Sequence, residues 1–134
     1  MRPTAADLAD ISLFASLSDS EREELAESFE LRSKAAGTQL IDERTGGYSF
    51  FALAEGEARV SVDGKEVAAL GAGDCFGEMA LLGDGRRTAS VTTTTPTTLY
   101  VMFGTEFRRL QQTHPQVVGR IQAMMRERLI RQAG

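Results

Sequence analysis

The chain has 134 residues, of which 42% are hydrophobic, and its formal net charge is -4 at pH 7. This length predicts a single domain over residues 1–134, and the composition excludes a disordered chain. The acidic balance is a poor match to a polyanion, so we expect no direct binding of nucleic acid, and no apolar run approaches the ~20 residues of a membrane span.

Two rare residue types restrict the chemistry further. Cys75 is the only cysteine, which excludes an intramolecular disulfide and fits a cytoplasmic location. His114 is the only histidine, whereas a metal enzyme built on a β-barrel needs several. The sequence contains no P-loop and no nucleophile elbow. We therefore expect no metal, no cofactor and no enzymatic activity.

The first thirty residues are predicted to be helical, because Leu8, Ile11 and Phe14 recur at helical spacing. Ser20 and Glu23 fit the pattern of a capping box at the start of a second helical stretch.

Residues 31–101 are predicted to be rich in strands, since glycines recur at intervals of roughly ten residues, as in an all-β barrel or sandwich. Asp63-Gly64 stands between two apolar runs and predicts a tight hairpin. The run of threonines that ends at Pro96 is interpreted as a strand and its end rather than as a functional ladder.

A glycine-rich segment precedes a short run of helix formers at residues 78–82. A helical turn that follows a glycine leaves backbone N–H groups unpaired, and these favour an anion. Arg87 is predicted on the same strand face as Ala89 and Val91, where a buried guanidinium needs an anionic partner. That partner is either Glu78, in an internal ion pair, or the phosphate of a ligand.

Residues 76–91, FGEMALLGDGRRTASV, closely resemble the phosphate-binding cassette of the cyclic-nucleotide-binding domain family. That family includes catabolite activator protein, the regulatory subunits of protein kinase A and cyclic-nucleotide-gated channels. The resemblance implies an α+β fold: a β-roll, or jelly roll, of about eight antiparallel strands with N-terminal helices and C-terminal lid helices.

The resemblance also implies roles for individual residues. Glu78 is expected to bind the ribose 2′-hydroxyl of a cyclic nucleotide, and Arg87 its exocyclic phosphate oxygens. Gly77, Met79 and Ala80 belong to the segment that contacts ribose and phosphate. Thr88 stands where a hydroxyl can reach the guanine amino group, and Ala58, Val60 and Leu70 are candidates for the wall against the base.

Two helices are predicted to close the chain, the second with Pro115 as its first residue. Val118, Ile121 and Met125 form an apolar stripe on it, and the next position on that stripe is Arg128. Arg128 either extends to solvent near the helix end or reaches the ligand. The second interpretation follows from the resemblance of this helix to the family's lid helix.

The sequence thus predicts a domain that binds a 3′,5′-cyclic nucleotide as a regulatory ligand, with cAMP favoured over cGMP and an effector of unknown identity. The alternative is a ligand-independent interaction module that has kept the fold. An enzyme is the weakest interpretation, because no catalytic constellation is visible.

Overall fold

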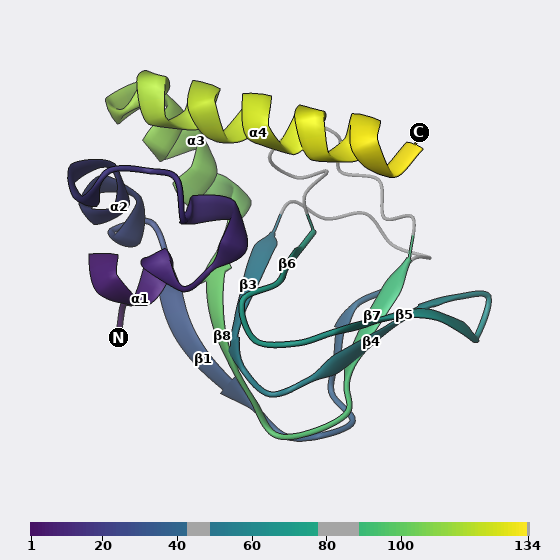
Figure 1. The fold of residues 1–134 in the computed structure, drawn as a ribbon. Helices are drawn as coiled ribbons and strands as arrows, with labels where there is room; N and C mark the ends of the chain where they lie inside the picture. The colour runs from purple at the N-terminus through teal and green to yellow at the C-terminus, as the bar shows by residue number, and fades with distance from the viewer. Residues whose placement is uncertain (43–48, 78–88, 134) are drawn as a thin grey trace.

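The computed structural model describes residues 1–42, 49–77 and 89–133, with side chains as far as residue 127. Within these ranges, eight strands form two antiparallel four-stranded sheets that enclose a β-roll, with helices at both ends of the chain (Figure 1). The predicted fold is confirmed. The strands are β1 (Glu30–Lys34), β2 (Gln39–Ile41), β3 (Phe50–Glu55), β4 (Ala58–Val62), β5 (Lys65–Leu70), β6 (Cys75–Phe76), β7 (Ser90–Thr93) and β8 (Thr97–Met102).

The two sheets have different surroundings. One, in the order β1-β8-β3-β6, carries the helices on its outer face and is called the helix-side sheet. The other, in the order β2-β7-β4-β5, ends in the β4–β5 hairpin and is called the hairpin-side sheet. In the hairpin turn, Asp63 has φ +52° and Gly64 φ +78°, as a tight two-residue turn of this kind requires, so the predicted hairpin is confirmed.

Strand alternation divides the apolar residues into two cores. Phe50 faces the helices, where its ring lies 6.2 Å from that of Phe14 and 6.3 Å from that of Phe29. Its neighbour Phe51 faces the opposite way, into the roll between the sheets. The helix-side sheet therefore has apolar residues on both faces, whereas the hairpin-side sheet buries only one.

The N-terminal segment is helical, as predicted, and forms α1 (Ala5–Ala9), the 3-10 helix η1 (Ser12–Phe14) and α2 (Asp19–Ala26). The capping box predicted at Ser20 and Glu23 is wrong, because the structure forms it two residues earlier, at Ser18 and Glu21. The side chain of Ser18 accepts the Glu21 N–H at 3.1 Å, and the Ser18 N–H donates to Glu21 at 2.9 Å. Arg22 fixes this start because its guanidinium reaches back to the carbonyl oxygens of Phe14 and Leu17.

Two connections between strands meet at the far end of the roll from the helices. Gly56 has φ +97°, and a Cβ atom there would lie 2.6 Å from the carbonyl oxygen of Pro96. The Glu57 N–H donates to the Thr95 hydroxyl at 2.9 Å, and the Thr94 N–H donates to the Glu57 carbonyl at 2.9 Å. The threonine run therefore forms a structural corner, which agrees with its interpretation as a strand and its end.

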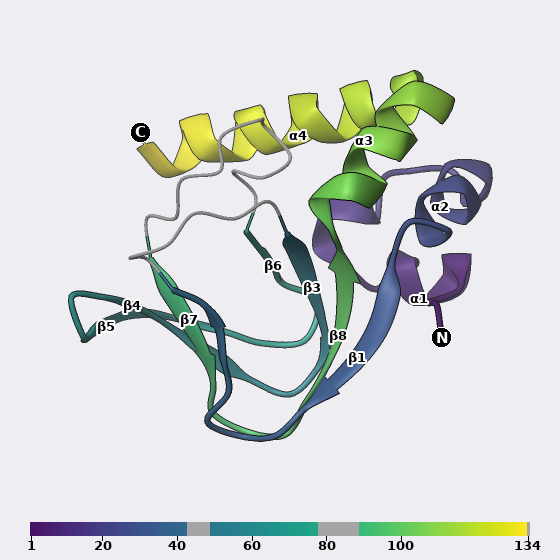
Figure 2. The same cartoon turned by 180° about the vertical axis from the view of Figure 1, so that it is seen from behind.

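The chain closes with α3 (Gly104–Thr113) and α4 (Pro115–Ala133), so the predicted start of the last helix is confirmed. The predicted stripe of Val118, Ile121 and Met125 is buried. Both views show α4 lying across one end of the roll, from the N-terminal helices toward the side of the hairpin-side sheet (Figures 1 and 2). Arg120 on α4 forms an ion pair with Glu21 on α2.

Candidate functional site

Strand β6 places the start of the cassette at the inner wall of the roll. It pairs with β3, and the Phe76 ring stacks on the Phe51 ring with centroids 5.0 Å apart and planes 9° from parallel. Gly77 follows with φ +78°, a backbone conformation that favours glycine. The chain thus leaves the helix-side sheet through a glycine turn, as the sequence predicted.

The turn before β6 is held by hydrogen bonds that the sequence did not reveal. The Gly71 N–H donates to the Asp74 carboxylate at 2.8 Å, and the Asp74 N–H donates to the Gly71 carbonyl at 3.1 Å. Leu53 on β3 donates its N–H to the Asp74 carbonyl and accepts the Gly73 N–H, both at 2.8 Å. The cluster Gly71-Ala72-Gly73-Asp74 between two strands is a turn signal, but it does not by itself identify the role of the Asp74 carboxylate.

On the other side of the cassette, β7 belongs to the hairpin-side sheet. Val91 is buried in the inner core, while Ser90 lies on the opposite strand face. The cassette therefore connects the two sheets of the roll. Five of the predicted contact residues, Glu78, Met79, Ala80, Arg87 and Thr88, lie outside the described residues, as does the side chain of Arg128.

The predicted base wall lies on the inner face of the hairpin-side sheet. Ala58 is 1% exposed and belongs to the inner core, whereas Val60 and Leu70 are only half-buried at its edge. Ala68 pairs with Val60 on the same face and is exposed. The inner wall is thus covered at Ala58 and open along β5, which leaves Val60, Ala68 and Leu70 as the accessible part.

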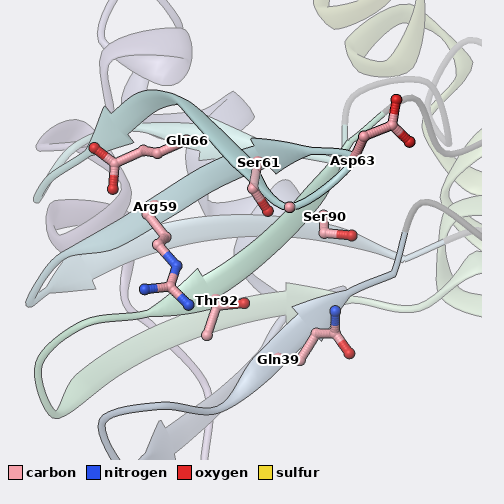
Figure 3. Close-up of a pocket in the computed structure, with 8 residues that line it drawn as sticks. Gln39, Arg59, Ser61, Asp63, Glu66, Ser90 and Thr92 are labelled. Atoms are coloured by element: carbon pink, nitrogen blue, oxygen red, sulfur yellow. The ribbon is translucent and has the colours of Figure 1, made fainter.

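A separate hollow of about 570 Å³ lies on the outer face of the hairpin-side sheet (Figure 3). Its lining is polar: Gln39, Arg59, Ser61, Asp63, Gly64, Glu66, Ser90 and Thr92. A shift of register between Val60 and Ser61 pairs Ser61 with Glu66, so both side chains reach this outer face. Because Val60 faces inward, the hollow and the interior of the roll lie on opposite sides of one sheet.

The last helix is held firmly along its first half. Besides the buried stripe and the Arg120–Glu21 ion pair, the Ser16 hydroxyl donates to Met124 Sδ at 3.3 Å. His114, just before α4, lies 3.4 Å from the Glu24 carboxylate. α4 is therefore docked on the N-terminal helices before it extends across the roll (Figure 1).

Other kinds of site find no support in residues 1–42, 49–77 and 89–133. These residues contain no group of three or more His, Cys, Asp or Glu placed to hold a metal ion. Among the helices described there, none is long and apolar enough to cross a membrane.

The described residues thus form a β-roll whose two sheets flank the cassette segment in the chain, with α4 lying across one end (Figure 1). The family profile described as cyclic nucleotide-binding domain matches residues 31–114. The chain belongs to this family, which is not a catalytic one.

Individual proteins and a solved structure are also similar to this chain. The chain is 37% identical over 105 residues to a cAMP-dependent protein kinase regulatory subunit from Colletotrichum orbiculare, covering 77% of this chain and 27% of that protein. It is 35% identical over 96 residues to the Drosophila melanogaster cGMP-dependent protein kinase, isozyme 1, covering 66% of this chain and 12% of that protein. The catabolite activator protein structure from Thermus thermophilus matches with a TM-score of 0.77 and 28% identity, over 90% of this chain and 59% of that one.

Proposed function

We propose that the chain binds a 3′,5′-cyclic nucleotide as a regulatory ligand within the open end of the roll. The observation that carries this proposal is the position of the cassette's two flanks. Gly77 follows a strand of one sheet and Ser90 begins a strand of the other, with Phe76 and Val91 both in the inner core. A ligand held by residues 77–88 would therefore face the accessible inner wall.

The chemistry of the cassette suits the parts of a cyclic nucleotide. If the alternation of Val91 and Ala89 continued back along the chain, Arg87 would face the interior, where its planar fork could pair with two phosphate oxygens. Glu78 would accept a hydrogen bond from the ribose 2′-hydroxyl. Gly77, Met79 and Ala80 would line the sugar and phosphate, and the base would rest on the wall that includes Val60. We expect binding without turnover of the nucleotide.

We propose cAMP as the favoured ligand, by less than about tenfold over cGMP, which is ~1.4 kcal/mol. This preference is supported by the names of similar proteins. More of them are named as cAMP-dependent protein kinase regulatory subunits than as cGMP-dependent protein kinases. Thr88 can offer one hydroxyl contact to guanine, worth only about 0.5–1.5 kcal/mol, which biases the choice without deciding it.

We propose that the distal part of α4, with Arg128 reaching toward the ligand, acts as the lid. A ligand changes output only by preferring one arrangement of a mobile element. The docked first half of α4 supports a hinge beyond Met125, which is 2% exposed. The effector that reads the lid is unknown, and a cytoplasmic location fits the single thiol.

The experiment compares Arg87→Ala with Arg86→Ala by calorimetric titration with cAMP. Loss of a charge-assisted bidentate contact should cost about 2–4 kcal/mol, or roughly 30- to 1,000-fold in affinity. Arg86 should matter much less, because strand alternation would point it away from an inward-facing Arg87. If Arg86→Ala lost more affinity for cAMP than Arg87→Ala, Arg86 rather than Arg87 would face the ligand. If both variants bound cAMP as tightly as the unmodified chain, the cassette arginines would not be part of the site.

A further inference from the structure

A second cavity, of about 260 Å³, lies between the N-terminal helices and the outer face of the helix-side sheet. Its lining consists of Asp7, Asp10, Ile11, Ala54, Ala72, Gly73 and Tyr100. Tyr100 packs in the outer core with the helices, while Phe76 and Val91, which flank the cassette, lie in the inner core of the roll. The cavity is therefore separate from the proposed nucleotide site.

Tyr100 is the anomalous residue in this cavity. It is only 7% exposed, yet no residue in the described part of the chain forms a hydrogen bond with its hydroxyl. Buried tyrosines usually place their hydroxyl against a hydrogen-bond partner. The hydroxyl is not among the described polar atoms that are wholly enclosed without a partner, so it opens onto the cavity.

Asp7 and Asp10 give the lining of the cavity negative charge, and this lining contains no lysine, arginine or histidine. Asp7 accepts the Thr4 N–H through one carboxylate oxygen, at 2.9 Å, which leaves its other oxygen for another donor. The Asp10 carboxylate forms no hydrogen bond or ion pair with any described residue. Burial, and then the charges of Asp7, Asp10 and Glu55, raise the pKa of Tyr100. A cation in the cavity would relieve this field.

The remaining wall is apolar, which indicates the kind of cation. Ile11, Ala54 and Ala72 supply the apolar part of the lining. A bare metal ion would leave the apolar wall exposed to water. Two carboxylates with a phenol also form a weak ligand set for a metal. A primary ammonium on an alkyl chain has three N–H donors at one end and methylene groups that pack on an apolar surface.

We propose that this cavity binds a primary alkylammonium group, with the N–H donors on Asp10, the free oxygen of Asp7 and the Tyr100 hydroxyl. The group can belong to a free small amine or to the lysine side chain of another protein. Both present the same chemistry to the cavity.

The test follows the backbone amide NMR signals of Ala54, Ala72 and Gly73 at pH 7.5 and constant ionic strength. The probes are 1,5-diaminopentane and Nα-acetyl-lysine methylamide, with tetramethylammonium as a cation that has no N–H donor. Saturable shifts with a millimolar or tighter Kd are expected for the two amines only. Tighter binding of the diamine would indicate a free amine, and tighter binding of the lysine derivative a protein side chain.

Variants separate the site from general charge. Asp10→Asn should weaken amine binding at least tenfold and Tyr100→Phe several-fold, while Glu57→Gln, an exposed carboxylate outside the cavity, should leave it unchanged. Thermal unfolding would check that each variant folds. The proposal is overturned if tetramethylammonium shifts the same amides equally, if no shift saturates by about 50 mM, or if Asp10→Asn binds as tightly as the unmodified chain.

Discussion

Single residues at close backbone contacts hold the corners of the roll. Gly56 combines φ +97° with a Cβ position 2.6 Å from the Pro96 carbonyl oxygen. Gly56→Ala should therefore lower the free energy of unfolding by about 2–4 kcal/mol, through backbone strain and overpacking together. Gly37 is the matched control, with φ +82° and nothing within 4 Å of its Cβ position.

Gly37→Ala should cost only the backbone strain, about 1 kcal/mol. Urea unfolding of the two variants measures the difference. If Gly56→Ala and Gly37→Ala lowered the free energy of unfolding equally, the close contact with Pro96 would contribute nothing. Backbone strain alone would then explain the effect of Gly56→Ala.

At the scale of residues, the sequence reveals what depends on near neighbours. The Asp63-Gly64 turn follows from its two flanking apolar runs. The role of Gly56 depends on Pro96, which is about forty residues away in the chain. The role of Tyr100 depends on Asp7, which is still farther away in the chain. No local pattern contains that information.

Among the elements, α2 and α4 are joined through one titratable residue. The Ser18 N–H, and then the Arg120 guanidinium, lower the pKa of Glu21. A carboxyl group whose pKa is lower in the folded chain adds stability above its unfolded pKa, and this stability is lost as the pH falls through the folded value. Glu21→Gln keeps a hydrogen-bond acceptor for Ser18 and removes only the charge.

Glu21→Gln should lower the free energy of unfolding at pH 7 by up to about 1 kcal/mol. The difference from the unmodified chain should shrink below about pH 4. Urea unfolding across this pH range measures it, with the exposed Glu23→Gln as control. A stability difference that persisted undiminished at about pH 3 would show that the Glu21 charge is not the cause.

The distal part of α4 is the proposed lid. Hydrogen exchange should slow on cAMP addition in residues 126–133, because a lid that closes over the ligand holds its backbone hydrogen bonds more firmly. Residues 117–125 include the buried stripe and Arg120, so their exchange should be slow with or without ligand. Peptide-resolved mass spectrometry separates the two segments. Identical exchange of residues 126–133 in both states would argue for a fixed cap.

Element boundaries show where local pattern reasoning fails. Ser18–Glu21 and Ser20–Glu23 both fit the capping pattern, and nothing within the pattern distinguishes them. The choice depends on Arg22, which contacts carbonyl oxygens of the preceding 3-10 turn. Pro115 was located correctly because proline at the first helical position needs no tertiary partner.

For the whole molecule, the glycine intervals predicted an all-β barrel or sandwich, and the family resemblance of the cassette implied a β-roll with helices at both ends. The cassette's contact residues beyond Gly77 remain predictions, since Glu78 and Arg87 lie outside the described residues. The open edge of the inner wall at Ala68 was not foreseen, because its exposure depends on β5 being an edge strand.

Calorimetric titration of the unmodified chain with cAMP and cGMP decides whether this roll binds a cyclic nucleotide. We expect one site per chain for each nucleotide, with cAMP bound more tightly by less than about tenfold. A folded chain that gives no saturable binding of either nucleotide at about 1 mM would rule out regulatory nucleotide binding and favour a ligand-independent module.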